Sequence, residues 1–265
     1  MYVDATESAA PADAAAYDCL AVPGLQGWPR LQAQLVDRIK RAALRQLHAS
    51  AAGERLLLRT YLIGEEATEI ALQRDLITQR PDWLVRQMDR HLAEEQQHAQ
   101  RFAAALAERV PASASSRRGV PHAGMTQGNS PAAQSQPDFL SRRKIATWQR
   151  LAHTYAPRFE QGMLVPAFAI GLCAEQMATR VLDRHCSTIS TRHTLHPLLS
   201  SVLADEARHV RLCSRTLMRL AAPSEQATLA ELLEKIRAVD RSWGITSAVA
   251  MLLAGCVLRI GSRPA

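Results

Sequence analysis

Apolar residues recur along most of this chain at the spacing of α-helices. Between Leu31 and His48 they fall on every third or fourth position, as on one face of a helix. No alternating apolar and polar run of useful length indicates a β-strand. The pattern predicts an all-α protein with helices over 31–48, 52–78, 82–110, 142–155, 165–185, 197–220, 225–243 and 245–260.

Two breaks in the pattern predict how these helices connect. Pro81 ends the helix before it and Asp82 is a good N-cap for the next one, so this pair should pack antiparallel across a short turn. Residues 110–138 are rich in Ser, Gly, Pro, Ala and Gln, which predicts a flexible crossover. A connection of that length is explained if helices two and three of a bundle lie parallel, since the chain must then cross the full length of the bundle.

Composition and charge narrow the class of protein. The Ala- and Pro-rich residues 1–27 are expected to form a flexible N-terminal segment, followed by a single helical domain over 28–265. The net charge of +7 is carried almost entirely by Arg. These residues are dispersed, without a basic run interleaved with aromatics, which disfavours nucleic acid as a partner.

The cysteines and the chain ends bear on location. Five Cys show neither a CxxC pair nor zinc-type spacing, which suits a reducing compartment. The acidic N-terminus has no basic-then-apolar signal pattern, so a cytoplasmic location is expected. The apolar run at 245–260 is shorter than the roughly 20 residues that span a bilayer, and we expect a packed C-terminal helix without a membrane span.

Two similar stretches, LAEEQQH and LADEARH, place charged residues within apolar helical patterns. Each contains Glu-x-x-His, formed by Glu95 with His98 and by Glu206 with His209. One such match is weak evidence, but the spacing puts both side chains on one helix face, able to hold one ion. Both motifs are expected on buried faces, because the residues seven positions away from each Glu are apolar, namely Met88, Phe102, Leu199 and Cys213.

Two other helices supply candidate partner carboxylates. Glu175 and Glu65 also have apolar residues seven positions away on both sides. Glu175 precedes Glu206 by 31 residues. Glu65 precedes Glu95 by 30, so all four fall in one layer of two similar helical hairpins. Glu69 shares the inner face but lies only 26 residues before Glu95, which makes it an alternative ligand or a residue that supports a ligand.

Four carboxylates and two imidazoles in one core layer have few explanations. Without a cation the carboxylates repel one another, and some of them must bind protons. Two divalent ions would neutralise four carboxylates. Mixed oxygen and nitrogen ligands with open positions suit iron or manganese better than structural zinc. The pattern therefore predicts a buried two-metal site.

In this respect the sequence resembles the ferritin-like di-iron carboxylate superfamily, in which two helices each supply a Glu and two others each supply Glu-x-x-His. The resemblance covers about residues 54–220, the metal-binding bundle, and the long crossover between the second and third helices fits the same topology. It implies a four-helix bundle with additional flanking helices, and two iron ions or a manganese–iron pair. The implied ligands are Glu65, Glu95, His98, Glu175, Glu206 and His209.

The resemblance also implies partners for these ligands. In this family the acid just before the motif Glu often receives a hydrogen bond from the ligating His of the opposite motif. The implied pairs are Asp205 with His98 and Glu94 with His209. His91, one turn before its motif Glu, is similar to the extra ligand of p-aminobenzoate-type N-oxygenases. In those enzymes, however, that His belongs to the last ligand helix, so here a hydrogen-bonded core His is favoured.

The resemblance implies O2 chemistry and leaves the reaction open. The CxxC pairs of rubrerythrin-type peroxidases are absent, and Phe102 stands where ribonucleotide-reductase-type proteins have a Tyr. The expected function is an O2-dependent di-iron oxygenase that acts on a small organic molecule and takes electrons from a separate donor. The alternatives are a ferritin-like ferroxidase and a non-enzymatic helical binding protein with a degenerate site. A homodimer is among the assemblies left open.

Overall fold

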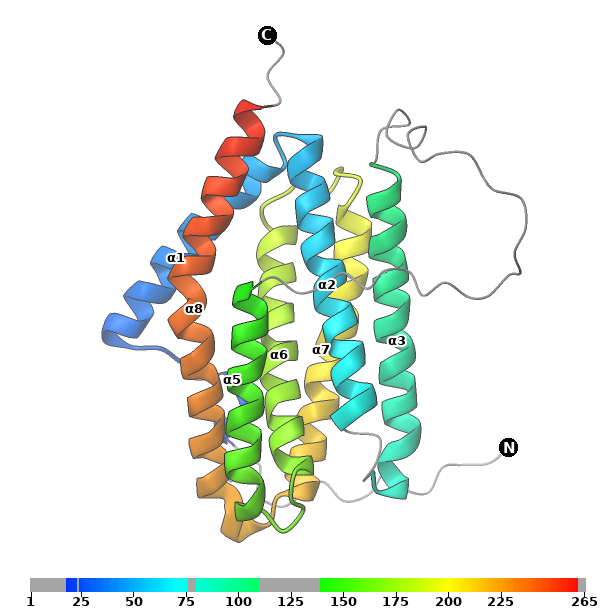
Figure 1. The fold of residues 1–265 in the computed structure, drawn as a ribbon, viewed down its shortest axis with the longest axis vertical. Helices are drawn as coiled ribbons and strands as arrows, with labels where there is room; N and C mark the ends of the chain where they lie inside the picture. The colour runs from blue at the N-terminus through cyan, green and yellow to red at the C-terminus, as the bar shows by residue number, and fades with distance from the viewer. Residues whose placement is uncertain (1–17, 23, 76–79, 110–138, 262–265) are drawn as a thin grey trace, which may run out of the picture.

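This computed structural model describes residues 18–22, 24–75, 80–109 and 139–261, without the side chains of 69–75 and 139–141. Within these ranges the fold is all-helical and contains no strand, which confirms the predicted class there (Figure 1). The predicted crossover, 110–138, lies outside this description. The α-helices are α1 (Gly27–Leu47), α2 (Ala51–Asp75), α3 (Asp82–Ala107), α5 (Phe139–Tyr155), α6 (Leu164–Cys186), α7 (His196–Leu220) and α8 (Gln226–Ile260).

The C-terminal helices differ from the prediction. Residues 225–243 and 245–260 are predicted as two segments, but α8 runs through Gly244 without a break. A single glycine lowers helix stability by about 1 kcal/mol relative to alanine. That is too little to end a helix that packs along α1. The contact between the two helices therefore outweighs the local propensity.

α2, α3, α6 and α7 lie side by side in the body of the molecule (Figure 1). α2 packs on α3, α6 packs on α7, and α3 also contacts α7. Followed by colour in Figure 1, α2 and α7 descend whereas α3 and α6 ascend, so α2 and α3 are antiparallel as predicted. α1, α5 and α8 pack beside α6, and α8 runs along α1.

The inner faces of the four central helices are apolar on both sides of one polar level. On α3 the buried side chains of Met88 and Phe102 belong to two separate apolar clusters, and Glu95 lies between them along the helix. α6 and α7 repeat this order around Glu175 and Glu206. The carboxylates are thus enclosed by apolar packing above and below.

The segment before α1 joins the fold earlier than predicted. Residues 1–17 lie outside the described part of the chain. Leu20, however, is buried in the core, and its carbonyl accepts a hydrogen bond of 2.8 Å from Gln176 Nε2 on α6. An apolar side chain and a backbone hydrogen bond thus anchor the chain already at Leu20, while the division into an N-terminal segment and a helical domain stays a prediction.

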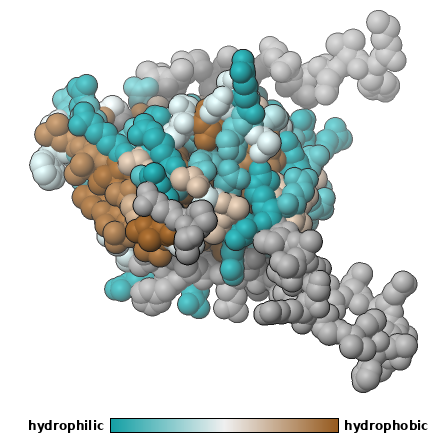
Figure 2. Space-filling model, turned by 90° about the horizontal axis from the view of Figure 1, so that it is seen from above, coloured by the Kyte–Doolittle hydropathy of each residue, from teal (hydrophilic) through white to brown (hydrophobic). Residues whose placement is uncertain are grey.

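α8 is packed on one face and exposed on the other. By length and composition Pro223–Ile260 is apolar enough to cross a membrane, a property that core helices of soluble proteins share, so the absence of a membrane span stays a prediction. The space-filling view shows an apolar patch on the side where α8 lies (Figure 2). The large apolar side chains exposed on α1 and α8 are Trp28, Leu31, Leu35, Ile245, Val249, Leu253, Val257 and Ile260.

Two glycines of α8 provide a matched test of its contact with α1. A Cβ at Gly255 would lie 2.9 Å from the Cβ of Gln46 on α1, whereas one at Gly244 would lie 3.7 Å from Val36, an ordinary contact. We expect Gly255→Ala to lower the free energy of unfolding by about 1–3 kcal/mol through overpacking. Gly244→Ala should raise it by up to about 1 kcal/mol. Urea unfolding followed by circular dichroism measures both, and equal effects would contradict this packing.

Candidate metal centre

α3 carries three ionisable side chains on its buried face. His91, Glu95 and His98 are each at most 2% exposed and lie between the apolar residues Met88 and Phe102. Their spacing of four and then three residues keeps them on one side of the helix, as the sequence pattern predicts. The helix thus presents two imidazoles and one carboxylate to the interior.

The other three central helices complete the group. α7 contributes Glu206 and His209 and α6 contributes Glu175, all of them buried. Glu65 on α2 is the most accessible member, with 12% of its side chain exposed. The structure therefore brings together, at one level of the core, all six residues predicted as ligands: Glu65, Glu95, His98, Glu175, Glu206 and His209. We call this set, together with His91, the Glu/His layer.

The donor atoms of the Glu/His layer fall into two groups, and within each group they lie within 4.8 Å of one another. The first group is Glu65, Glu95, His98 and Glu206. The second is His91, Glu95, Glu175 and His209. Glu95 belongs to both. Each group has a size and a donor set that suit one ion.

Glu95 and Glu206 lie between the two motif histidines. His98 Nδ1 is 3.7 Å from Glu206 and 4.0 Å from Glu95. His209 Nδ1 is 2.9 Å from Glu95 and 3.7 Å from Glu206. The centres of the two imidazole rings are 5.9 Å apart. The two groups are therefore adjacent, and two carboxylates approach both histidines.

Each motif histidine forms a hydrogen bond, through Nε2, with the acid that precedes the Glu of the opposite motif. His98 Nε2 donates a hydrogen bond of 3.0 Å to Asp205. His209 Nε2 donates one of 2.9 Å to Glu94. Arg208 contacts both acids, at 2.6 Å from Asp205 and 3.1 Å from Glu94. Since a carboxylate only accepts, these bonds place a ring proton on Nε2, and the two hydrogen bonds expected from the resemblance are confirmed.

The opposite ring nitrogens have no such partner. Among the described residues, four buried atoms of the layer lack a hydrogen bond: His91 Nδ1, His98 Nδ1, His209 Nδ1 and Glu206 Oε2. A buried polar atom left without a partner costs about 1–3 kcal/mol. Four at one level need an explanation. A bound cation supplies one, because in the neutral ring the Nδ1 lone pair faces the carboxylates.

A second histidine group, between α1, α2 and the loop before α7, shows the opposite arrangement. His48, Glu54 and His193 also offer donor atoms within 4.8 Å of one another. Here Glu54 lies 3.1 Å from His48 Nδ1 and 3.0 Å from His193 Nε2. His48 Nε2 lies 2.6 Å from His185, whose other nitrogen accepts a hydrogen bond of 2.7 Å from Tyr61. Protein groups satisfy these rings, unlike the motif histidines.

The ionisation of the layer reflects negative charge in a site removed from water. Burial, followed by the neighbouring Glu206 carboxylate, raises the pKa of Glu175 well above its ordinary value. Burial alone would also raise the pKa of Glu95, but the neighbouring imidazoles of His209 and His91 lower it. Burial would lower the pKa of His209, yet the neighbouring carboxylates of Glu206 and Glu95 raise it to about 10. Without a cation, protons must balance the charge.

His91 belongs to the layer rather than to the apolar core around it. Its Nε2 lies 3.1 Å from Glu95 and 3.3 Å from Glu175, and its ring centre is 3.9 Å from that of His209. It is hydrogen-bonded, as the sequence favours, and it also stands where it can act as a ligand. The side chain of Glu69, the alternative ligand, lies outside the described residues.

Sequence reasoning missed the network around His48. For His91 the expected hydrogen-bonded core position is confirmed, since its spacing of four from Glu95 places it on the same buried face. His48, Glu54 and His185 come from three different helices or their ends and share no spacing that would reveal them. Only the folded arrangement brings them together.

The donor set of the layer suits a pair of divalent transition metals. Within the described residues neither group contains a thiolate, and carboxylate oxygens mixed with imidazole nitrogens are ligands that iron and manganese accept. Closed structural zinc sites have four ligands and often contain Cys. Comparison of the chain with protein-family models, curated proteins and solved structures gave no match. The chemistry of the layer is therefore inferred from its own side chains.

Replacing Glu175 by Gln tests the electrostatic cost of the layer. Because Glu175 is buried beside Glu206 and its pKa is raised, a neutral amide should not destabilise the metal-free protein. We expect the melting temperature of Glu175→Gln, measured with a chelator present, to equal or exceed that of the parent chain. The exposed Glu108→Gln is the matched control and should leave it unchanged. A large decrease for Glu175→Gln alone would show that the ionised carboxylate is already balanced by the protein.

Proposed function

We propose that this protein is a ferritin-like di-iron oxidoreductase, an oxygenase that uses O2 on a small organic substrate. The observation that supports this most directly is the pair of buried donor groups that share Glu95. In these groups the Nδ1 atoms of His98 and His209 face carboxylates and have no hydrogen-bond partner among the described residues. The Nε2 atom of each ring is hydrogen-bonded to an acid on the opposite helix, which orients the ring. A core selected for stability alone would gain from apolar side chains at this level.

We further propose that α2, α3, α6 and α7 form a ferritin-like four-helix bundle within a single domain, with α1, α5 and α8 as flanking helices. All four contribute to the Glu/His layer. Residues 110–138 are followed by α5, which runs opposite to α3, and α6 then runs in the same direction as α3 (Figure 1). The crossover between the parallel helices α3 and α6 would therefore consist of residues 110–138, which lie outside the described part, together with α5, which carries the chain back to the start of α6.

Four of the proposed ligands would each serve one ion: Glu65 and His98 the first, Glu175 and His209 the second. Iron would supply the electrons that reduce O2, and a separate donor would restore them. Glu65 is the most exposed ligand, so O2 and a small substrate would approach from the side of α2. All five cysteines are free, which suits the reducing conditions of a cytoplasmic enzyme.

The remaining residues of the layer would connect and orient the two sites. Glu95 and Glu206 approach both motif histidines and would contact both ions. Asp205 and Glu94 would hold the ring proton on Nε2, which leaves Nδ1 free to bind. The apolar clusters on both sides of the layer would exclude water from the reacting groups.

Metal content tests this proposal. After anaerobic loading with Fe(II), we expect about two irons per chain by elemental analysis, as the two donor groups imply. Glu65→Gln should retain about one, because the other group is intact, whereas Glu95→Gln should lose both since Glu95 is shared. Glu108→Gln, an exposed control, should retain two. A parent chain that binds no iron would refute the proposal and favour a non-enzymatic binding protein.

Exposure of the loaded protein to O2 separates the two enzymatic candidates. An oxygenase should give O2-dependent optical bands and remain a small assembly. A ferroxidase should turn over Fe(II) without an organic substrate and form a large symmetric assembly. Native mass spectrometry distinguishes the assemblies, and a cage-sized particle would contradict the oxygenase.

The acids behind the histidines provide a further test. Asp205→Asn keeps the size of the side chain but weakens its hold on His98, and we expect it to reduce metal affinity about 10- to 100-fold. Asp89→Asn is the control, because Asp89 is an exposed residue of α3 that pairs with Arg80. Competition with a coloured chelator measures both. Equal affinities of the two variants would mean that Asp205 does not orient a ligand.

A further inference from the structure

A cavity of about 500 Å³ lies between α1, α6 and α8, apart from the Glu/His layer. On α6 it is lined by Cys173, Gln176 and Met177. Glu175, which lies between these residues in the sequence, faces the layer instead. Successive helical residues are about 100° apart around the axis, so the cavity and the layer occupy opposite sides of α6. The metal chemistry proposed above therefore does not account for the cavity.

The cavity has a large excess of positive charge. Its lining contains one acid, Asp240, and six cationic side chains, which are Lys40, Lys144, Arg180, Arg184, Arg237 and Arg241. Asp240 is shared between Lys144 at 2.6 Å and Arg180 at 3.5 Å. Arg184 pairs with Asp37, and Arg241 with Glu234, both from outside the lining. The acids of the protein thus balance part of the charge.

Lys40 lines the cavity, and no acid of the described residues contacts its ammonium group. Within the described part of the chain it makes no ion pair or hydrogen bond, although it faces the cavity. Burial lowers the pKa of Lys40, and Arg184 lowers it further against the opposing effect of Asp240. Arg237 Nε is also buried without a hydrogen-bond partner. A half-buried ammonium among like charges is costly unless a ligand supplies the counter-charge.

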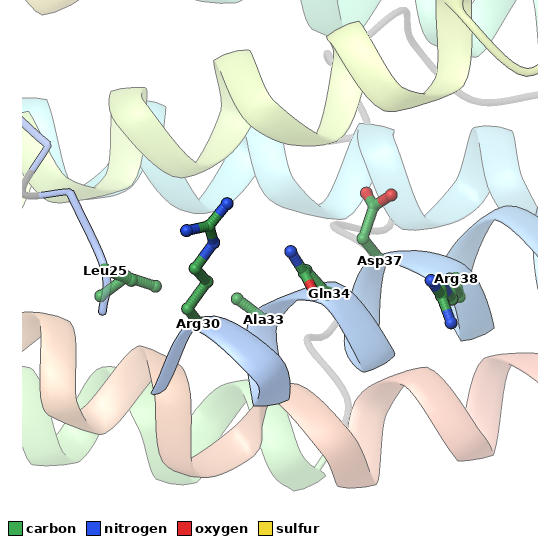
Figure 3. Close-up of a pocket in the computed structure, with 6 residues that line it drawn as sticks. All are labelled: Leu25, Arg30, Ala33, Gln34, Asp37 and Arg38. Atoms are coloured by element: carbon green, nitrogen blue, oxygen red, sulfur yellow. The ribbon is translucent and has the colours of Figure 1, made fainter. Parts of the chain in front are cut away.

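The remaining walls of the cavity are mainly apolar. Val36 and Trp243 line it from α1 and α8, and its volume is that of a pocket for a small organic molecule. An adjoining recess on α1 shares Leu25 and Ala33 with the cavity (Figure 3). Arg30 extends from α1 in this recess and adds a further cation beside the cavity. Charge and hydrocarbon surface are therefore combined in one site.

We propose that this cavity binds a small amphipathic organic anion, with its carboxylate or similar head beside Lys40 and its apolar body against Val36 and Trp243. The excess of cations selects the sign of the ligand's charge. The apolar walls favour a ligand with a hydrocarbon part over an inorganic ion. The site does not depend on the proposed metal centre, so it can be tested in metal-free protein.

Calorimetric titration of the full chain with four probes tests this inference. The probes are decanoate, decanol, decylamine and inorganic phosphate. We expect decanoate to bind at least about tenfold more tightly than each of the others, because it alone combines the charge with the apolar body. Absence of decanoate binding would overturn the proposal. Equal binding of decanol or decylamine would remove the role of the cations, and equal binding of phosphate would remove that of the apolar walls.

Two cavity variants and one control variant locate the ligand within the cavity. Lys40→Met preserves side-chain length and should weaken decanoate binding about tenfold, while the free protein melts at or above the temperature of the parent chain. Lys235→Met removes an exposed lysine outside the cavity and should bind decanoate as the parent does. Ala33→Trp, which narrows the opening, should weaken binding as well. If Lys40→Met and Lys235→Met bind decanoate equally, the ligand lies elsewhere, for example on the exposed apolar patch of α1 and α8, and the proposal fails.

Discussion

Negative charge removed from water is the constraint on which the arrangement of the central helices depends. Glu95, Glu175 and Glu206 lie at one level, enclosed by apolar packing on both sides. Within the described residues, the side chains that face them there are imidazoles rather than Lys or Arg. Close packing of the helices brings the carboxylates together, so the packing of the core and the repulsion between its charges act against each other unless cations or protons intervene.

The hydrogen bonds of the histidines separate two roles that residue type alone does not distinguish. The rings around His48 and Glu54 are satisfied by neighbouring protein groups and tie α1 to α2 and α6. The rings of His98 and His209 are satisfied on one side only, and the unsatisfied side faces carboxylates. A binding role is therefore better indicated by which ring atom lacks a partner than by the presence of a histidine cluster.

Much of the fold and of the Glu/His layer could be predicted from the sequence, because both depend on helical periodicity. Apolar residues seven positions from Glu95 and Glu206 predicted their burial, and the matched separations predicted that Glu65 and Glu175 would join them. The helix break predicted at Gly244 was wrong, because the packing of α8 on α1 outweighs the low helix propensity of glycine. The cavity could not be predicted from the sequence, because its cations come from helices that are distant in sequence. Along the chain these residues appear as dispersed charge.

The positions of His91, Glu95 and His98 on one helix also limit how the length of this chain can change. Each residue added to or removed from an α-helix turns everything beyond it by about 100° around the axis and moves it by about 1.5 Å. A single insertion between His91 and His98 would therefore carry one of them out of the interior without altering any side chain. Insertions and deletions between the layer residues of α3 or α7 would therefore disrupt the site, whereas in the loop between α6 and α7 no ligand position depends on the count.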